Sequence, residues 1–320
     1  MIPAEYSRLV KARACELGFD SAGITTLEPP PHTAALRRWL DAGFAGTMTY
    51  MHRQARLRSE PARIAPGATH AVMVTRNYFL PDTAAPEGHG HVAKYARGDD
   101  YHSALQVPLA SLAGYVRSLG GTETVARTFV DAGPVPEREL AQRAGIGWIG
   151  KNTMLLSPQR GSYFFLASIL TNLKLAPDLP FEADRCGSCR RCLEACPTGA
   201  FVEPRVLDSR RCISYLTIEY RGEIAPPLAA AMEDWVFGCD VCQAVCPWNV
   251  RFARPADDEV LRQRPSLEWL DLRWLGQVGD EEFERTLGIT TLERPGPAGM
   301  RRNARVAAAN RRAGGTGSER

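Results

Sequence analysis

Two cysteine runs decide how part of this chain must fold: CGSCRRCLEACP at residues 186–197 and CDVCQAVCP at residues 239–247. The first run has the pattern C-x2-C-x2-C-x3-C-P, with its thiols at Cys186, Cys189, Cys192 and Cys196. This pattern is typical of the run that wraps a [4Fe-4S] cluster in bacterial-type ferredoxins. Two-residue gaps let a turning backbone direct successive thiolates into one cavity. The run therefore predicts iron–sulfur ligands.

The second run lacks one ligand of the four. Its cysteines match the last three positions of the first run and are Cys239, Cys242 and Cys246. Cys212 is the remaining cysteine nearby and can supply the fourth thiolate. In two-cluster ferredoxins the last cysteine of each run binds the other cluster. One predicted ligand set is therefore Cys186, Cys189, Cys192 and Cys246. The other is Cys196, Cys212, Cys239 and Cys242.

Disulfides and zinc are the alternative uses of these thiols. Eight of the nine cysteines fall between residues 186 and 246, whereas the N-terminus has no apolar stretch of the kind found in a signal peptide. We therefore expect a cytoplasmic protein, where disulfides are rare. Structural zinc sites also use C-x2-C pairs, but rarely four cysteines within eleven positions ending in Cys-Pro. The ninth, Cys15, is expected to be a buried small hydrophobe.

Composition narrows the class of protein. The chain has 320 residues, of which 44% are hydrophobic and 23% charged, as in ordinary globular domains. No apolar run approaches the roughly 20 residues that cross a bilayer, so no membrane association is predicted. The formal net charge of +3 neither requires nor excludes a nucleic-acid partner.

Helices and apolar strands alternate in the first half of the chain, which predicts a layered α/β (α+β) core. Strands are expected at residues 71–75, 124–130 and 162–170. Helices are expected at residues 5–17, 36–41 and 101–119. The predicted domains are a core at residues 1–177, a ferredoxin-like two-cluster domain at 178–256, and a helical C-terminal segment with a flexible tail at 257–320.

The stretch AGIGWIGKNT contains Gly145, Gly147 and Gly150 in the spacing G-x-G-x-x-G. Dinucleotide binding needs such glycines between a preceding strand and a following helix. Here a helix, ERELAQRA, precedes the glycines and a strand follows them. We therefore interpret these glycines as a helix terminator and a site of close backbone approach, not as a nucleotide-binding loop.

Three stretches beyond the cysteines resemble epoxyqueuosine reductase: KYARGDDYH at 94–102, DAGPVPERELAQRAGIGWIGKNT at 131–153 and GSYFFLASILT at 161–171. The resemblance covers roughly residues 4–310. That family, similar in its cofactors to reductive dehalogenases, uses cobalamin and two [4Fe-4S] clusters to convert epoxyqueuosine in tRNA to queuosine. Its cobalamin has no histidine ligand, and the D-x-H-x-x-G signature is absent here. Longer members continue with helical HEAT-like repeats.

The resemblance implies roles for particular residues. Asp131, at the end of a predicted strand, matches the proposed proton donor, which would act beside cob(I)alamin fed by the clusters. The candidate cobalamin contacts, besides Asp131, are Arg58, Tyr95, Arg97, Trp148, Gly150, Lys151 and Asn152. On the residues alone, the favoured interpretation is that Asp131 only bonds backbone N–H groups in the following turn; the family resemblance is what favours catalysis.

The implied partner is the anticodon stem-loop of queuosine-type tRNAs, where single-stranded bases can be splayed into a pocket. Three arginine-rich stretches, at 53–63, 190–211 and 301–312, are candidates for phosphate contacts. An external donor such as a flavodoxin or ferredoxin would supply electrons, and we expect a monomer. Two alternatives are a corrinoid iron–sulfur reductase acting on a small molecule and a non-catalytic ferredoxin-type electron carrier.

Overall fold

Four antiparallel strands form the main sheet, in the order β1-β2-β7-β4, in a computed structural model that describes residues 2–256, 261 and 264–315. These strands are β1 (Ser21–Thr26), β2 (His70–Asn77), β7 (Phe164–Thr171) and β4 (Ala126–Val130). The three predicted strands are therefore present as β2, β4 and β7. Because every pairing is antiparallel, the core is of the α+β type.

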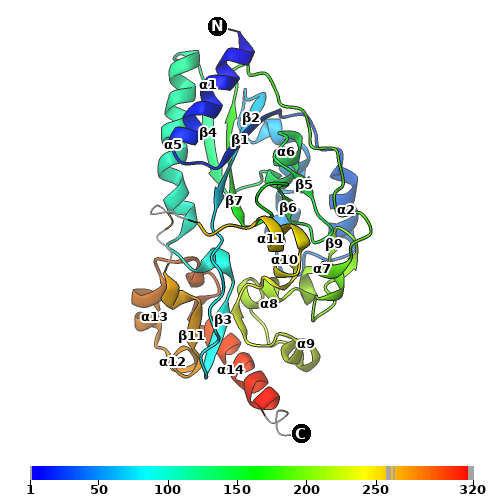
Figure 1. Cartoon of the computed structure of the whole chain (residues 1–320), viewed down its shortest axis with the longest axis vertical. Coiled ribbons are helices and arrows are strands. Elements are labelled where there is room, and N and C mark those ends of the chain that lie inside the picture. Colours follow the sequence, from blue (N-terminus) through cyan, green and yellow to red (C-terminus); the bar gives the residue numbers. More distant parts are fainter. Residues whose placement is uncertain (1, 257–260, 262–263, 316–320) are drawn as a thin grey trace.

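Helices cover both faces of this sheet (Figure 1). In β2, Val72 and Val74 pack toward α1 (Pro3–Glu16) and α5 (Tyr101–Gly120). The alternate residues Ala71 and Met73 pack on the other face, where α6 (Glu137–Arg143) lies. The alternation follows from the two-residue period of a strand and produces two cores, one on each face.

Short elements connect these layers. The helices between β1 and β2 are α2 (Thr33–Asp41), α3 (Thr49–Arg53), α4 (Ala55–Ser59) and the 3-10 helix η1 (Pro61–Arg63). After α6 come the paired strands β5 (Trp148–Ile149) and β6 (Leu155–Leu156). Helices predicted at 5–17, 36–41 and 101–119 correspond to α1, α2 and α5. Cys15 is exposed, so its predicted burial is wrong: it lies on the solvent side of α1.

The two cysteine runs lie in a region of short elements below the main sheet in Figure 1. Its helices are α7 (Arg191–Glu194), η3 (Ser209–Arg211), α8 (Ile213–Ile218), α9 (Pro226–Ala231), α10 (Val241–Ala244) and α11 (Pro247–Phe252). A small hairpin joins β8 (Phe201–Glu203) to β9 (Val206–Leu207).

A second sheet combines strands from all three predicted segments. Its order is β10-β3-β11, with bounds Trp235–Phe237, His89–Val92 and Trp269–Asp271. The 3-10 helices η2 (Lys94–Ala96) and η4 (Pro265–Leu267) adjoin β3 and β11. One apolar core joins Val92, Val236 and Leu270. The predicted three-domain division is therefore not a division into separate sheets.

The C-terminal segment is helical, as α12 (Leu272–Gln277), α13 (Asp280–Leu287), η5 (Thr291–Glu293) and α14 (Gly296–Gly315). The last of these helices, α14, continues to Gly315. The end of the predicted flexible tail, residues 316–320, lies outside the described residues. Along the described chain, no helix has both the length and the hydropathy required to cross a bilayer.

Candidate active site and cluster ligands

The eight clustered cysteines are free thiols that the fold gathers into two groups. Burial raises the pKa of the Cys192 thiol, and the neighbouring Cys246 and Cys186 raise it further. Burial also raises the pKa of the Cys246 thiol, and the neighbouring Cys186 and Cys189 raise it further. These are the four thiols expected to share one cluster.

The other four thiols form the second group. Burial raises the pKa of the Cys242 thiol well above its usual value, and nearby Cys239 and Cys212 add to that shift. Cys196 is a further neighbour of both Cys239 and Cys242. Each group offers four thiols, the donor set that a [4Fe-4S] cluster requires, and bound iron would favour the thiolate form. The pairing of these residues with clusters stays a prediction.

The Trp148–Asn152 stretch contacts both cysteine runs. The Trp148 indole N–H donates to Cys186 Sγ at 3.4 Å. Lys151 Nζ donates to the backbone carbonyls of Gly187 and Cys189, at 2.5 and 2.9 Å. Asn152 Nδ2 donates to the carbonyl of Cys242 at 3.3 Å. These three residues were candidates for cobalamin, but their observed partners belong to the cluster region.

Contacts within the protein explain the glycines in and just before this stretch. A Cβ on Gly147 would lie 2.0 Å from the carbonyl oxygen of Leu156, and one on Gly150 would lie 2.5 Å from Leu156 Cδ1. Gly145 has φ +75° and a Cβ there would meet the carbonyl oxygen of Leu179. A larger residue at Gly145 or Gly147 would push the facing backbone away. A cobalamin contact at Gly150 stays a prediction.

Asp131 directly follows β4 and is held in an unusual conformation. Its φ is +46°, in the left-handed region that non-glycine residues seldom adopt. The Tyr101 hydroxyl donates to Asp131 Oδ2. The Asp131 backbone N–H donates to Glu137 Oε1 at 3.2 Å. Because Asp131 itself is exposed, these contacts hold a carboxyl group at the surface of the site.

Two neighbours of Asp131 have strongly shifted acidities. Burial raises the pKa of Glu137 to about 8, and the negative charge of Asp131 adds to that shift. Burial and then Asp131 raise the pKa of Tyr101 as well. Neither Glu137 nor Tyr101 was a predicted site residue. Both lie inside stretches that carry the family resemblance, and this was the signal that could have identified them.

Arg58 bonds to the loop that follows Asp131. Its guanidinium donates to the carbonyls of Gly133 and Val135, at 3.3 and 3.4 Å. Its Nε is buried and has no hydrogen-bond partner among the described residues. That orphaned donor fits a bound group with an acceptor oxygen, so Arg58 remains a candidate cobalamin contact. Tyr95 lies nearby, with its ring centroid 6.2 Å from that of Tyr101.

Arg97 lies in an ion cluster instead. It is 2% exposed, and its guanidinium contacts Asp82 and Glu268 at 2.8 and 3.2 Å. Lys94 also pairs with Asp82. Asp82, His91 and Glu268 have the spacing of metal ligands. The two cations already neutralise the two carboxylates, so this cluster has a structural role, and the cobalamin contact predicted for Arg97 stays a prediction.

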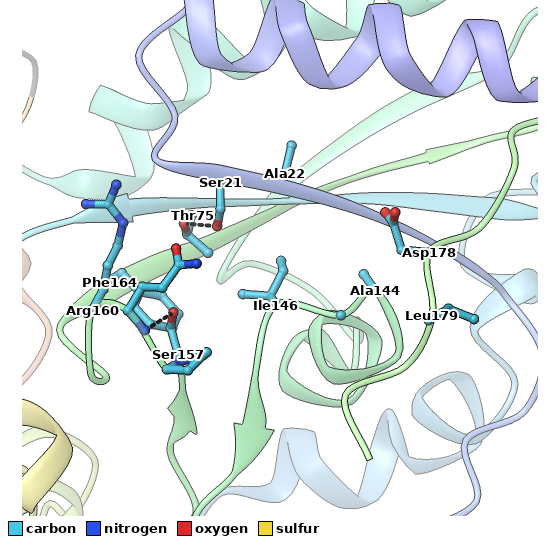
Figure 2. A pocket seen from close by; sticks show the side chains of 13 residues that line it. Ser21, Ala22, Thr75, Ala144, Ile146, Ser157, Arg160, Phe164, Asp178 and Leu179 are labelled. Carbon is cyan, nitrogen blue, oxygen red and sulfur yellow. Dashed lines mark hydrogen bonds between the residues drawn. The ribbon is translucent and has the colours of Figure 1, made fainter. Parts of the chain in front are cut away.

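A cavity of about 470 Å³ lies beside β1 and β2. Figure 2 shows Ser21 and Thr75 bonded to each other there, at 2.7 Å, with Ala144 and Ile146 across from them. Asp131 does not line this cavity, and β4 stands two places from β2 in the sheet. The Asp131 site is therefore separate from it.

The arginine-rich stretches divide into structural and available residues. Arg302 is 5% exposed and donates to three backbone carbonyls, so it cannot reach RNA. Arg56 and Arg63 both pair with Glu60. Exposed arginines without an ion-pair partner among the described residues include Arg53, Arg191 and Arg305.

Two family models match the chain. Residues 58–132 match the model described as epoxyqueuosine reductase QueG, DUF1730, and residues 185–249 match a 4Fe-4S double cluster binding domain. The first match begins at Arg58 and includes Asp131, while the second includes the eight cysteines of the two groups.

Similar proteins extend this result to nearly the whole chain. An epoxyqueuosine reductase from Pseudomonas aeruginosa is 42% identical over 314 residues, which is 96% of this chain and 86% of the relative. One from Escherichia coli is 37% identical, over 96% of this chain and 81% of the relative.

Solved structures of epoxyqueuosine reductases are also similar to nearly the whole chain. A crystal structure of epoxyqueuosine reductase with a tRNA-Tyr epoxyqueuosine-modified stem loop matches with a TM-score of 0.86 at 30% identity, covering 96% of this chain and 81% of that one. A Bacillus subtilis epoxyqueuosine reductase, with its catalytic aspartate loop swung out of the active site, matches with a TM-score of 0.85 at 29% identity, over 96% and 82%.

Proposed function

The chain belongs to the epoxyqueuosine reductase family, and from that premise we propose that it reduces epoxyqueuosine to queuosine in tRNA with Asp131 as the proton donor. The observation that carries the role of Asp131 is its placement. An exposed carboxyl group follows the end of β4, in a strained backbone conformation that Tyr101 and Glu137 hold. Strain retained at such a position is typical of functional sites.

The reaction defines what the protein must provide. Removing the epoxide oxygen breaks two C–O bonds, forms a C=C bond and releases water, which takes two electrons and two protons. When bound, the two [4Fe-4S] clusters and cobalamin supply the electrons. The protein must bring a proton to the departing oxygen, and a positioned carboxylic acid can do so. Asp131 is the acid for this step.

The residues around Asp131 act by holding it. Tyr101 donates to one carboxyl oxygen, which leaves Oδ1 as the oxygen to carry the transferable proton. Glu137 accepts the backbone N–H, and Arg58 fixes the carbonyls of Gly133 and Val135. Together they fix both ends of the loop, so that the carboxyl group is oriented before the substrate arrives.

The residues present fit the cofactors. The two groups of four thiols would hold the clusters, and Arg58 would present its orphaned Nε to cobalamin. Exposed Arg53, Arg191 and Arg305 are available for tRNA phosphates. We propose a cytoplasmic monomer that receives electrons from a flavodoxin or ferredoxin and binds the anticodon stem-loop.

The test is conversion of epoxyqueuosine in tRNA. Anaerobically reconstituted protein is mixed with epoxyqueuosine-containing tRNA and a chemical reductant, and the nucleosides are quantified by mass spectrometry. We expect conversion by the intact chain and by Asp41→Ala, an exposed aspartate at the end of α2, but none by Asp131→Ala. Unchanged conversion by Asp131→Ala would remove its role as proton donor. Failure of the loaded intact chain would overturn the substrate assignment.

A further inference from the structure

A tryptophan from the α+β core bonds directly to a predicted cluster ligand. Trp148 opens β5, and its indole N–H donates to Cys186 Sγ at 3.4 Å. The side chain is 2% exposed. Its ring stacks on Phe181, with centroids 5.5 Å apart, and meets Trp248 edge-on at 4.9 Å. Packing on two sides leaves the indole little freedom, so its N–H is aimed at the sulfur.

A cation three residues further on lies at the same cysteine run. Lys151 Nζ donates to the carbonyls of Gly187 and Cys189, on either side of Ser188. No carboxylate pairs with this ammonium group in the part of the chain that the structure describes. The Trp148–Asn152 stretch therefore brings one N–H donor and one positive charge to the first cysteine run.

The indole N–H of Trp148 and the positive charge of Lys151 both affect the reduction potential of the cluster. A one-electron reduction adds one negative charge to a cluster and its four thiolates. An N–H donor to a ligand sulfur and a nearby cation stabilise that added charge, so they raise the reduction potential. The effect is enhanced in a buried, low-dielectric surrounding such as the apolar cluster of Trp148, Leu156 and Cys246.

We propose that Trp148 and Lys151 are positioning residues that raise the reduction potential of the cluster bound through Cys186. Because both lie in the stretch that follows α6, the core itself would adjust how readily this cluster accepts an electron. The inference rests on the proposed function, specifically on the assignment of Cys186, Cys189, Cys192 and Cys246 to one cluster.

The experiment is an anaerobic redox titration of the reconstituted full chain, followed by electron paramagnetic resonance. Trp148→Phe keeps the aromatic packing and removes only the indole N–H. Trp248→Phe is the matched control, because Trp248 lies in the same aromatic group but donates to the carbonyl of Arg185 at 3.3 Å. Lys151→Gln removes the charge independently of the indole.

We expect Trp148→Phe to lower one of the two cluster potentials and leave the other unchanged. Only the strengthening of the Trp148–Cys186 hydrogen bond on reduction shifts the potential, so its loss should reduce the ratio of reduced to oxidised cluster by up to about tenfold at a fixed potential, which equals about 59 mV for one electron. Lys151→Gln should shift the same potential in the same direction, and Trp248→Phe should not move it.

Iron and sulfide analysis separates this inference from the proposed function. Fewer than about eight of each per chain in the intact protein would refute the cluster assignment itself. With full loading, an unchanged potential in Trp148→Phe, or an equal shift in Trp248→Phe, would overturn the role of the indole. If Trp148→Phe does not fold, an unchanged potential in fully loaded Lys151→Gln overturns the proposal.

Discussion

Replacing Glu137 by Ala should release the catalytic loop without touching the carboxyl group of Asp131. In the structure Glu137 Oε1 accepts the Asp131 backbone N–H at 3.2 Å, across the loop that joins β4 to α6. Alanine removes this acceptor. Among the described residues, Asp131 then keeps the Tyr101 contact alone to offset its left-handed backbone conformation.

The expected size of the effect follows from two free energies, the cost of the left-handed conformation and the contribution of the hydrogen bond to Glu137. The left-handed conformation costs a non-glycine residue about 1–2 kcal/mol. Because burial raises the pKa of Glu137 to about 8, its carboxyl group is mostly neutral at pH 7, and a hydrogen bond to a neutral acceptor contributes about 0.5–1.5 kcal/mol net. Losing it should lower the fraction of chains with Asp131 in place by up to about tenfold, since about 1.4 kcal/mol is one factor of ten. Glu137→Gln retains a neutral acceptor oxygen and should lose no more than about threefold.

The assay is a single-turnover measurement on pre-reduced, fully loaded protein, with queuosine formation followed by nucleoside mass spectrometry. We expect Glu137→Ala to be several-fold slower than the intact chain, up to about tenfold, with tRNA affinity unchanged, and Glu137→Gln to remain near the intact chain. Two results would refute the reasoning. Glu137→Ala could react at the normal rate, or Glu137→Gln could be as slow as Glu137→Ala, which would assign the effect to the ionisable group instead.

Three further outcomes are expected. Burial raises the pKa of Glu137 to about 8, above the roughly 4.3 of an unfolded chain. The protonated form therefore stabilises the fold fully below about pH 4, and this stabilisation is lost as pH rises toward 8. Glu137→Gln cannot ionise, so its apparent Tm should exceed that of the intact protein by a growing margin between about pH 5 and pH 8. Arg302→Ala should destabilise the fold by about 3 kcal/mol in denaturant titrations because it orphans buried carbonyls, whereas Arg305→Glu should leave stability within about 0.5 kcal/mol and weaken tRNA binding in a salt-dependent way. Gly147→Ala should lose cluster iron during gel filtration, because its Cβ would lie 2.0 Å from a backbone oxygen of Leu156 and push the Trp148 stretch from the cysteine run.

The candidate active site includes the Tyr101 hydroxyl and the Glu137 carboxyl as well as Asp131. Both are buried enough to have raised pKa values, and both contact Asp131 from different elements, α5 and α6. Sequence reasoning identified Asp131 through its position after a strand and through the family resemblance. Apart from lying in stretches that carry the resemblance, its neighbours have no local pattern that marks them, because a tyrosine at a helix start and a glutamate in a first helical turn are common.

Local spacing determined the parts of this protein that depend on local backbone geometry. The C-x2-C-x2-C-x3-C-P run indicated iron–sulfur ligands, since its short gaps constrain where successive thiols can point. Apolar runs bounded by Gly, Pro and Asp likewise indicated β2, β4 and β7, because a buried strand needs continuous apolar character.

Only the tertiary structure decided which distant groups meet. Trp148, Lys151 and Asn152 were expected at cobalamin, yet they bond to groups 36 to 90 positions away in the two cysteine runs. Arg97 and Arg302 looked available for ligands but are buried by partners from other segments. Residue type and spacing specify what a side chain can bond to, whereas its actual partner depends on how separate elements pack against one another.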